Sequence, residues 1–408
     1  MGGPIVSASS ATVSEQGIVI ARYGRTPIRL AWSWWIFATA LLILIRPFFV
    51  ILTPPTAPGW LPWLLSAFFV LGLLITVLCH ELAHAIAARS FGWRVYEIRL
   101  TLWGGYTSFA EHDGNHPRTP MRSMVVALAG PAANILLALI LTLVAELTGP
   151  HLPSPWLGLI SVLTTGNWLI AAFNLLPGHP LDGGSVVETI GWKITGSKAQ
   201  GLIAAGWSGR LIVAALIIGV VAVLILRGDQ LPILLLVVVG VLVLMLWGAA
   251  GEGIKRGNAL RRAEATVLAE LAVAVILVSA TTPVAQVIDK LQKYPAGYHD
   301  QPLIVQLSSS QETGPPRVTG LIDPATLAQV PTEFRHQTSA HEVSQAFTGS
   351  THYVPADRRI SELGSALATD PDQVFLLTPG SGTPASTSQL PAAAVLGSRI
   401  AVYLSTGR

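Results

Sequence analysis

The sequence contains little charge and almost no cysteine. Asp, Glu, Lys and Arg make up only 12% of its 408 residues, and hydrophobic residues make up 51%, whereas soluble domains carry about 25% charged residues. This composition excludes an ordinary soluble protein and predicts an integral membrane protein with some soluble mass. The single cysteine, Cys79, excludes an intramolecular disulfide. The net charge of +3 is too small to indicate a nucleic-acid partner.

The sequence contains several long apolar runs. A helix needs about 20 apolar residues to cross the hydrocarbon core of a membrane. Candidate spans occupy residues 31–53, 61–88, 122–147, 157–176, 209–226 and 232–250. The run 266–280 is also apolar, but it is short and Glu270 interrupts it, so we expect an α-helical polytopic protein with about six spans between residues 31 and 250.

The basic residues are distributed asymmetrically. The links 54–60 and 148–156 are short, rich in proline and uncharged, whereas segments 89–122, 177–210 and 251–262 carry Arg and Lys repeatedly. The positive-inside rule then predicts a multi-pass protein of the cell membrane with both termini in the cytoplasm. Residues 1–30 lack the apolar core and cleavage site of a signal peptide, and we expect them to form a short disordered cytoplasmic tail.

The composition changes after residue 262. Short apolar runs such as PLIVQL (302–307) and QVFLLT (373–378) predict strands, and PVAQVIDKLQ (283–292) and RISELGSALA (359–368) predict amphipathic helices. We therefore expect a linker over 251–280, followed by a cytoplasmic α/β domain over 281–408 that contains two similar halves.

Three ionisable residues interrupt the second apolar run. His80, Glu81 and His84 form the pattern H-E-x-x-H, although charged residues at membrane depth cost roughly 2.5–3.5 kcal/mol each. On a helix, His80 and His84 lie on one face and can hold one ion, while Glu81 points about 100° round the axis, beside that ion. The alternative is a pair of satisfied core histidines. Cys79 lies outside the pattern and is expected to pack.

A catalytic zinc site needs a third protein ligand and an open position. Asp182 is the candidate, because it follows the fourth span, on the same side of the membrane as H-E-x-x-H. Pro177 and Pro180 break the helix there, and Gly183 and Gly184 permit a tight backbone path. The alternative is a simple Asp-Gly turn at the membrane interface.

These motifs resemble the site-2 protease family of intramembrane zinc metalloproteases. The family pattern N-x-x-P-x-x-P-x-D-G is met by Asn174, Pro177, Pro180, Asp182 and Gly183. In addition, LAGPAANILLAL (128–139) is similar to the family's Gly-Pro-x-x-Asn segment, and LWGGYTSF (102–109) resembles its Gly-containing hairpin.

The resemblance implies peptide hydrolysis within a membrane. One Zn²⁺ would be held by His80, His84 and Asp182, with Glu81 as general base. Asn174 would donate a hydrogen bond to the substrate backbone or the developing oxyanion, unless it only holds the end of the broken helix. The implied substrates are single-span membrane proteins, such as anti-sigma factors or signal-peptide remnants. An unwound substrate segment could add to the edge of the 102–109 hairpin.

The C-terminal part resembles a pair of cystathionine-β-synthase-type (CBS) domains, which implies a homodimer. Adenosine-binding pairs carry Ser or Thr and then Asp near the end of a strand. Here Asp323 and Thr326 stand in the opposite order, and residues 382–390 contain no acidic residue. The sequence therefore does not support an adenine nucleotide, and a pair used for packing or protein contacts is the alternative.

Two further groups of residues remain open as sites. EHDGNHP (111–117) looks like a second metal clamp, but its Gly and Pro predict a turn. His179 could line the mouth of the active site or lie in an exposed loop. Two other functions also remain: a transporter or channel gated by the CBS-like pair, and a catalytically silent homologue that binds membrane clients.

Overall fold

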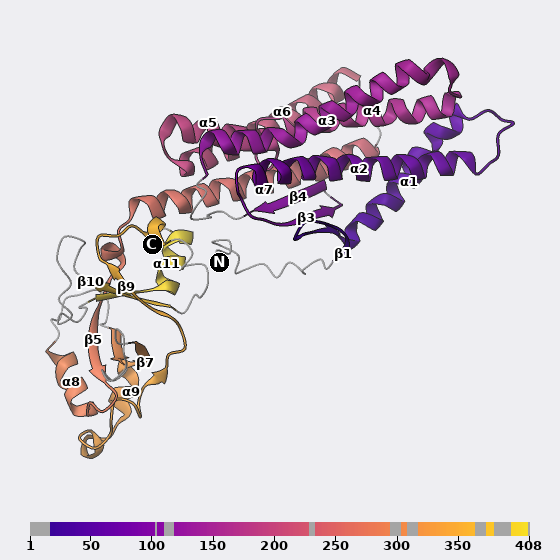
Figure 1. The fold of residues 1–408 in the computed structure, drawn as a ribbon. Coiled ribbons are helices and arrows are strands. Elements are labelled where there is room, and N and C mark those ends of the chain that lie inside the picture. The colour runs from indigo at the N-terminus through magenta and orange to yellow at the C-terminus, as the bar shows by residue number, and fades with distance from the viewer. Residues whose placement is uncertain are drawn as a thin grey trace. The chain divides into compact units, whose positions relative to one another are not determined.

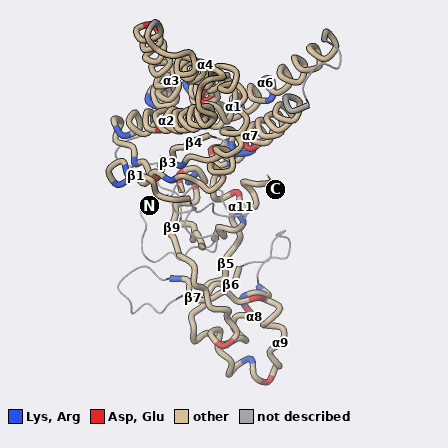
Figure 2. The backbone as a smooth tube through the Cα atoms, turned by 90° about the vertical axis from the view of Figure 1, so that its right-hand side faces the viewer, with Lys and Arg blue, Asp and Glu red and all other residues tan. Residues whose placement is uncertain are grey.

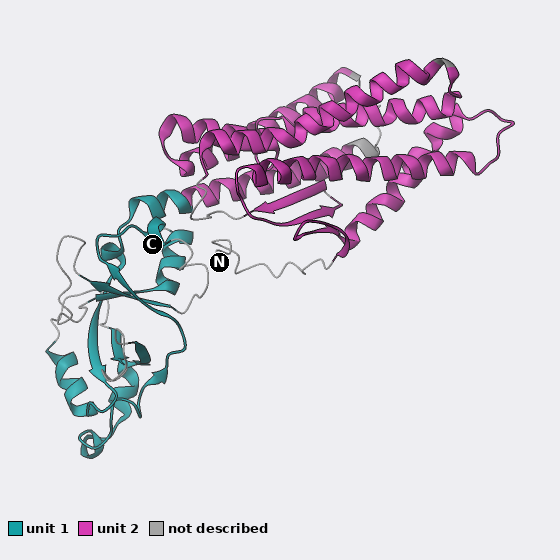
Figure 3. Cartoon of the chain, viewed as in Figure 1, with its two compact units in different colours: residues 1–6, 259–408 teal, residues 7–258 magenta. Residues whose placement is uncertain are grey.

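The computed structural model describes residues 17–102, 104–109, 118–227, 233–293, 303–307, 317–363, 373–378 and 393–406. The chain divides into two compact units, one formed by residues 7–258 and the other by residues 1–6 and 259–408 (Figure 3).

Six helices in the described part of the chain are long and apolar enough to cross a membrane, as the sequence predicts. They are α1 (Trp32–Leu52), α2 (Leu61–Ser90), α3 (Pro120–Thr148), α4 (Ser154–Asn174), α6 (Lys198–Arg227) and α7 (Ile233–Ala265) (Figure 1). Long stretches of these helices carry no Lys, Arg, Asp or Glu (Figure 2). The protein is therefore a multi-pass membrane protein.

The last two spans are longer than their apolar runs. α6 begins at Lys198 and α7 ends at Ala265, whereas the hydropathy pattern predicts helices only over 209–226 and 232–250. Polar residues continue a helix beyond the hydrocarbon, because helical hydrogen bonding does not depend on apolar side chains. Hydropathy therefore locates the membrane-embedded part of each helix and misses its extension.

A short helix follows the fourth span after a tight loop. α5 (Asp182–Thr195) begins directly after Leu181, and Gly196, which has a left-handed φ of 74°, caps its C-terminal end. Gly183 is required at its start, since a Cβ atom there would lie 2.4 Å from two backbone carbonyl oxygens, those of Leu175 and Leu176. The loop thus folds back on the end of α4 and directs Asp182 toward α2.

A four-stranded sheet accompanies the helices of the first unit. It has the order β1-β2-β3-β4, with β1 (Ile18–Tyr23), β2 (Thr26–Leu30), β3 (Val95–Thr101) and β4 (Gly104–Phe109). β2 and β3 are parallel and the other pairs are antiparallel. β4 is therefore an edge strand within the described residues.

The expectation of a disordered N-terminal tail is wrong for residues 18–30, which form β1 and β2. Ile28 and Leu30 are buried, and Ile28 packs in a core with Trp93 and Ile98. Thr26 also donates a hydrogen bond to the Val95 carbonyl oxygen at 2.8 Å. These partners lie more than 60 residues away in sequence, so the local pattern gave no sign of them.

The second unit contains a seven-stranded sheet with the order β8-β7-β6-β5-β11-β10-β9. Its strands are β5 (Val273–Ser279), β6 (Leu303–Leu307), β7 (Val318–Ile322), β8 (Gln345–Ala346), β9 (Thr351–Pro355), β10 (Val374–Thr378) and β11 (Ala393–Leu396). Among the described residues of this unit that follow α7, the α-helices are α8 (Val284–Gln292), α9 (Pro324–Gln329) and α11 (Gly397–Thr406). The strands predicted over 302–307 and 373–378 and the helix over 283–292 are confirmed.

The strand pairing confirms two similar halves. β5 and β6 are parallel and β6 and β7 antiparallel, and likewise β9 and β10 are parallel and β10 and β11 antiparallel. Residues 251–280, expected to be a linker, instead form the end of α7, a short 3₁₀ helix (Leu268–Leu271) and β5. The apolar run 266–280 is thus no seventh span, as expected.

Candidate metal centre

The H-E-x-x-H motif lies in the C-terminal half of α2, facing the protein interior. His80, Glu81 and His84 are only 6%, 5% and 7% exposed. α3 packs along α2 and presents Gly130 to the two imidazoles. A Cβ atom at Gly130 would lie 2.3 Å from Nε2 of His84 and 2.5 Å from Nε2 of His80, so only glycine leaves this space open.

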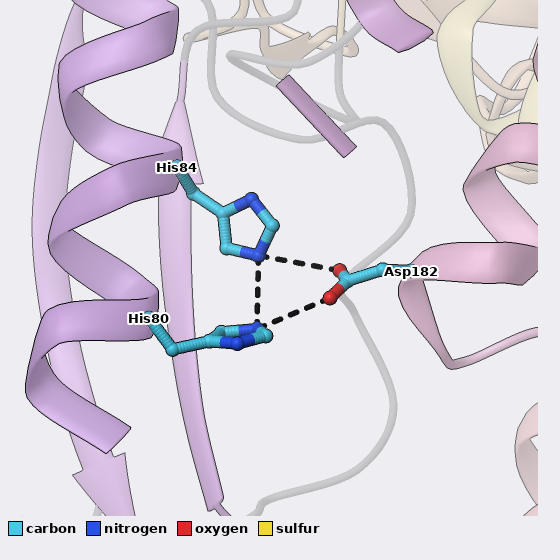
Figure 4. A group of neighbouring side chains, drawn as sticks. All are labelled: His80, His84 and Asp182. Carbon is cyan, nitrogen blue, oxygen red and sulfur yellow. Dashed lines mark hydrogen bonds and ion pairs between the residues drawn. The ribbon is translucent and has the colours of Figure 1, made fainter. Parts of the chain in front are cut away.

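Asp182 reaches the same space from the first turn of α5 (Figure 4). Its Oδ2 lies 3.1 Å from Nε2 of His80, and its Oδ1 lies 3.3 Å from Nε2 of His84. The two Nε2 atoms are 3.1 Å apart. The structure therefore brings together the three side chains that the sequence suggests as metal ligands, from segments about 100 residues apart.

A chain of buried amides fixes the orientation of the His80 ring. Nδ2 of Asn167 donates to the Leu163 carbonyl oxygen at 2.9 Å, and Oδ1 of Asn167 accepts from Nδ2 of Asn134 at 3.1 Å. Oδ1 of Asn134 then faces Nδ1 of His80 at 2.5 Å. A backbone carbonyl can only accept. The Leu163 carbonyl therefore fixes the orientation of the Asn167 amide, which fixes that of Asn134. Since Asn134 presents its Oδ1 to His80, Nδ1 of His80 must donate.

The second imidazole is fixed in the same way. Nδ1 of His84 donates to the Val126 carbonyl oxygen at 2.7 Å. A neutral imidazole that carries its proton on Nδ1 has a lone pair on Nε2. Both Nε2 atoms therefore point lone pairs at one another and at the Asp182 carboxylate.

This convergence of acceptors fits a metal ion. Oδ2 of Asp182 is buried and has no hydrogen-bond donor among the described residues. Acceptors that face one another without a proton between them repel, whereas a cation at their centre would stabilise all of them. Two imidazole nitrogens and one carboxylate are the ligands of a catalytic zinc site with one open position. The residues present therefore fit Zn²⁺.

Glu81 is held beside this group and not within it. Thr107 of β4 donates its hydroxyl to Oε2 of Glu81 at 2.7 Å. Gly105, on the same strand, lies against the carboxylate, where a Cβ atom would be 2.4 Å from Cγ of Glu81. The edge strand β4 thus forms one wall of the site.

The sequence interpretation missed the supporting polar residues. Asn134 belongs to the quoted Gly-Pro-x-x-Asn segment but received no role, and Asn167 and Thr107 were not singled out. Asn134 and Asn167 are at most 1% exposed, and each interrupts an apolar span. A buried amide at membrane depth needs a hydrogen-bond partner, and that signal could have identified both asparagines.

The remaining predicted residues lie elsewhere. Asn174 is the half-buried last residue of α4 and makes no side-chain hydrogen bond to another described residue, so its contact with substrate stays a prediction. His179 does not lie in an exposed loop: its ring packs 3.2 Å from where a Cβ atom of Gly253 would be. Burial lowers the pKa of His179, and the Arg256 guanidinium lowers it further.

Two other predictions concern residues away from the site. Cys79 is half-buried and belongs to no metal-binding group among the described residues, in agreement with a packing role. Residues 111–117 and 382–390 lie outside the described residues. Asp323 accepts a hydrogen bond from the Ala325 backbone at 2.9 Å and caps α9.

Comparison with known proteins finds a family whose model matches part of this chain. Residues 68–154, which contain His80, Glu81, His84 and Asn134, match the model of peptidase family M50. The resemblance to the site-2 proteases is thereby confirmed. The M50 match ends before Asp182, so the place of Asp182 in the site rests on the geometry described above.

Relatives of the M50 segment occur in several organisms. The chain is 40% identical to the protein sll0528 of Synechocystis sp. over 156 residues, which cover 38% of this chain and 40% of the relative. It is 33% identical to Rip3 of Mycobacterium tuberculosis over 211 residues, which cover 50% and 51%. Both names carry the term zinc metalloprotease. The matches thus span about half or less of these relatives.

A comparison of structures finds the Site-2 Protease from Methanocaldococcus jannaschii. The TM-score is 0.39 and the sequence identity is 18%, over 59% of this chain and 95% of that chain.

Proposed function

We propose that the protein is an intramembrane zinc metalloprotease that hydrolyses peptide bonds of transmembrane substrate helices. The observation that carries this proposal is the meeting of His80, His84 and Asp182 around one space, with Glu81 beside it, on helices that can span a membrane. A catalytically silent homologue would not need Glu81 in this position. A transporter would not need the metal ligands of a zinc protease.

The chain's own residues account for the proton transfers. Zn²⁺ held by His80, His84 and Asp182 would supply a Lewis acid that activates water and polarises the scissile carbonyl. Glu81 accepts the proton that the water loses and passes it to the leaving amine. Thr107 holds Oε2 of Glu81 and thereby fixes the direction of the carboxylate. Asn174 remains the candidate donor to the developing oxyanion.

The edge strand β4 supports a way to present the substrate. A transmembrane helix hides its carbonyl groups in its own hydrogen bonds, so it must unwind before hydrolysis. An extended segment can satisfy its backbone by pairing with a free strand edge. β4 is such an edge and contacts Glu81 through Thr107. A substrate strand paired with β4 would therefore run beside the catalytic carboxylate.

The wider setting follows the sequence pattern. We place the protein in the cell membrane with both termini in the cytoplasm, and we propose single-span membrane proteins, such as anti-sigma factors or signal-peptide remnants, as substrates. The repeated strand order of the second unit supports a CBS-like pair. We propose that this pair makes protein contacts, including those of a homodimer, without an adenine nucleotide.

The test measures metal content and cleavage in the same purified samples. Wild-type protein in detergent should contain about one zinc per chain and cleave a panel of fluorogenic single-span peptides. Glu81→Gln should keep the zinc and lose cleavage, because Glu81 is not a ligand. His84→Ala and Asp182→Ala should lose zinc. Cleavage by Glu81→Gln, or zinc loss in that variant, would contradict the roles assigned here.

A further inference from the structure

Arg210 lies on α6 at the boundary of its membrane-embedded part. The sixteen residues that follow it, 211–226, are all apolar or glycine. On α7, the apolar run that begins at residue 233 is closed by Trp247. Tryptophan is enriched at the level of the lipid headgroups. Arg210 and Trp247 therefore lie at the same edge of the hydrocarbon region, where lipid phosphates are found.

Two indole rings hold the guanidinium group of Arg210. Its central carbon lies 4.8 Å from the ring centroid of Trp207 on α6 and 4.9 Å from that of Trp247 on α7. Both tryptophans are about half exposed, 54% and 51%. Contacts of this kind stabilise the cation, and they restrict its orientation. They supply no hydrogen-bond acceptor for its N–H groups.

Arg210 has no counter-ion among the described residues. It makes no ion pair and no hydrogen bond with any of them, and its Nε is buried without an acceptor. Arg256, which lies on α7 beyond Trp247, differs from Arg210 because it has a counter-ion: its Nε lies 3.1 Å from the Glu252 carboxylate. A buried guanidinium N–H without an acceptor is costly. The guanidinium group of Arg210 thus has N–H donors without a protein acceptor among the described residues, and an oxyanion can accept from such donors.

We propose that the Trp207–Arg210–Trp247 group binds the phosphate of an anionic phospholipid. A planar guanidinium binds phosphate through paired N–H donors at its edge, and basic sites between membrane helices bind lipid headgroups. Exposed side chains beside the group supply an apolar surface for the acyl chains: Leu211 is 69% exposed and Leu244 is 74% exposed. A free phosphate ion has no acyl chains and would make no contact with that apolar surface.

The site lies next to the loop that precedes Asp182. Gly209 precedes Arg210 and packs against His179, whose carbonyl oxygen would be 2.8 Å from a Cβ atom there. A lipid that bridges α6 and α7 at Arg210 would therefore steady the helices against which this loop rests. The lipid site itself does not depend on the proposed protease activity.

The experiment is native mass spectrometry of the full chain in detergent. The probes are dioleoyl phosphatidylglycerol, dioleoyl phosphatidylcholine and inorganic phosphate. We expect wild-type protein to bind one phosphatidylglycerol in preference to phosphatidylcholine. Arg210→Gln should weaken that binding about fivefold or more. Arg256→Gln makes the same change of charge at a paired residue and should alter binding less than twofold.

Other outcomes would overturn the proposal. Equal losses in Arg210→Gln and Arg256→Gln would show attraction by net charge alone, and displacement of the lipid by millimolar inorganic phosphate would show a free-anion site. Trp247→Leu retains the charge and should also weaken binding, so unchanged binding there would exclude the aromatic clamp. If Arg210→Gln does not fold, as judged by gel filtration, the absence of a lipid preference in the wild-type protein would itself refute the site.

Discussion

Replacement of Asn167 by leucine should weaken zinc binding although Asn167 touches no metal ligand. In the wild-type protein, the Leu163 carbonyl fixes Asn167, Asn167 fixes Asn134, and Asn134 accepts from Nδ1 of His80. With leucine at 167, Asn134 loses the acceptor of its Nδ2 group and can turn that group toward His80. Nδ1 of His80 would then accept and Nε2 would carry the proton, which opposes metal binding.

The size of the effect follows from the position of the amides. Removal of a hydrogen-bond partner of a metal-ligating histidine typically reduces metal affinity by about 10- to 100-fold, which corresponds to about 1.4–2.8 kcal/mol. Asn134→Leu removes the acceptor itself and should lie at the upper end of this range. Asn134→Asp keeps an acceptor toward His80 and should restore most of the affinity.

Thr76→Val is the matched control for these variants. Thr76 receives a second hydrogen bond from Nδ2 of Asn167 at 3.2 Å, but the bond from Asn167 to the Leu163 carbonyl remains without it. The direction of the amide chain is therefore preserved, and zinc affinity should change less than about threefold. This variant removes a buried hydroxyl close to Asn167 and so reports any general loosening of the helices.

Zinc affinity is measured by competition with a chromophoric chelator in detergent, and thermal unfolding of the metal-free proteins is recorded beside it. We expect a loss of zinc affinity in Asn167→Leu and Asn134→Leu that exceeds any change in Thr76→Val. Equal affinities in wild-type protein and Asn167→Leu would refute the amide chain as the determinant of the His80 tautomer. Failure of Asn134→Asp to recover affinity would show that packing, and not the acceptor, matters.

Two glycines separate metal binding from proton transfer. Gly130→Ala would place a Cβ atom 2.3 Å from Nε2 of His84, so zinc should be lost in metal analysis, whereas Gly166→Ala, where a Cβ atom meets nothing within 4 Å, should retain it. Gly105→Ala would displace the Glu81 side chain, 2.4 Å from the new Cβ atom. Zinc should remain and peptide cleavage should fall by about 100-fold or more; cleavage at the wild-type rate would show that Glu81 tolerates the displacement.

The sequence was informative where one local pattern carried the signal. Apolar runs located the six spans because membrane insertion depends on the side chains of a single segment. His80 and His84 could be assigned to one metal site because residues four positions apart lie on the same face of a helix. Asp182 needed more than local pattern, since its approach to α2 depends on how the loop after α4 folds, and only the motif around it suggested the contact.

The missed features depend on contacts between distant segments. β1 and β2 form because Ile28 and Leu30 find a core built around β3, and nothing in residues 18–30 identifies that core. Likewise, the amide chain joins α2, α3 and α4, so each asparagine alone appears only as a polar residue in an apolar run. A search for amide side chains in the predicted spans would have found Asn134 and Asn167, but not the order in which hydrogen bonds connect them to His80.

The start of α6 was predicted 11 residues too late, at residue 209 in place of Lys198, and the Trp207–Arg210–Trp247 group could therefore not be recognised from the sequence. The apolar run predicted a span that begins at residue 209, so Arg210 fell at its start and Trp207 fell outside it, in the basic segment 177–210. The structure places them on a helix that begins at Lys198. Residues three apart on a helix are neighbours, which brings Trp207 onto Arg210. Helical continuity through the headgroup region, which hydropathy does not measure, therefore creates the aromatic clamp that α7 completes with Trp247.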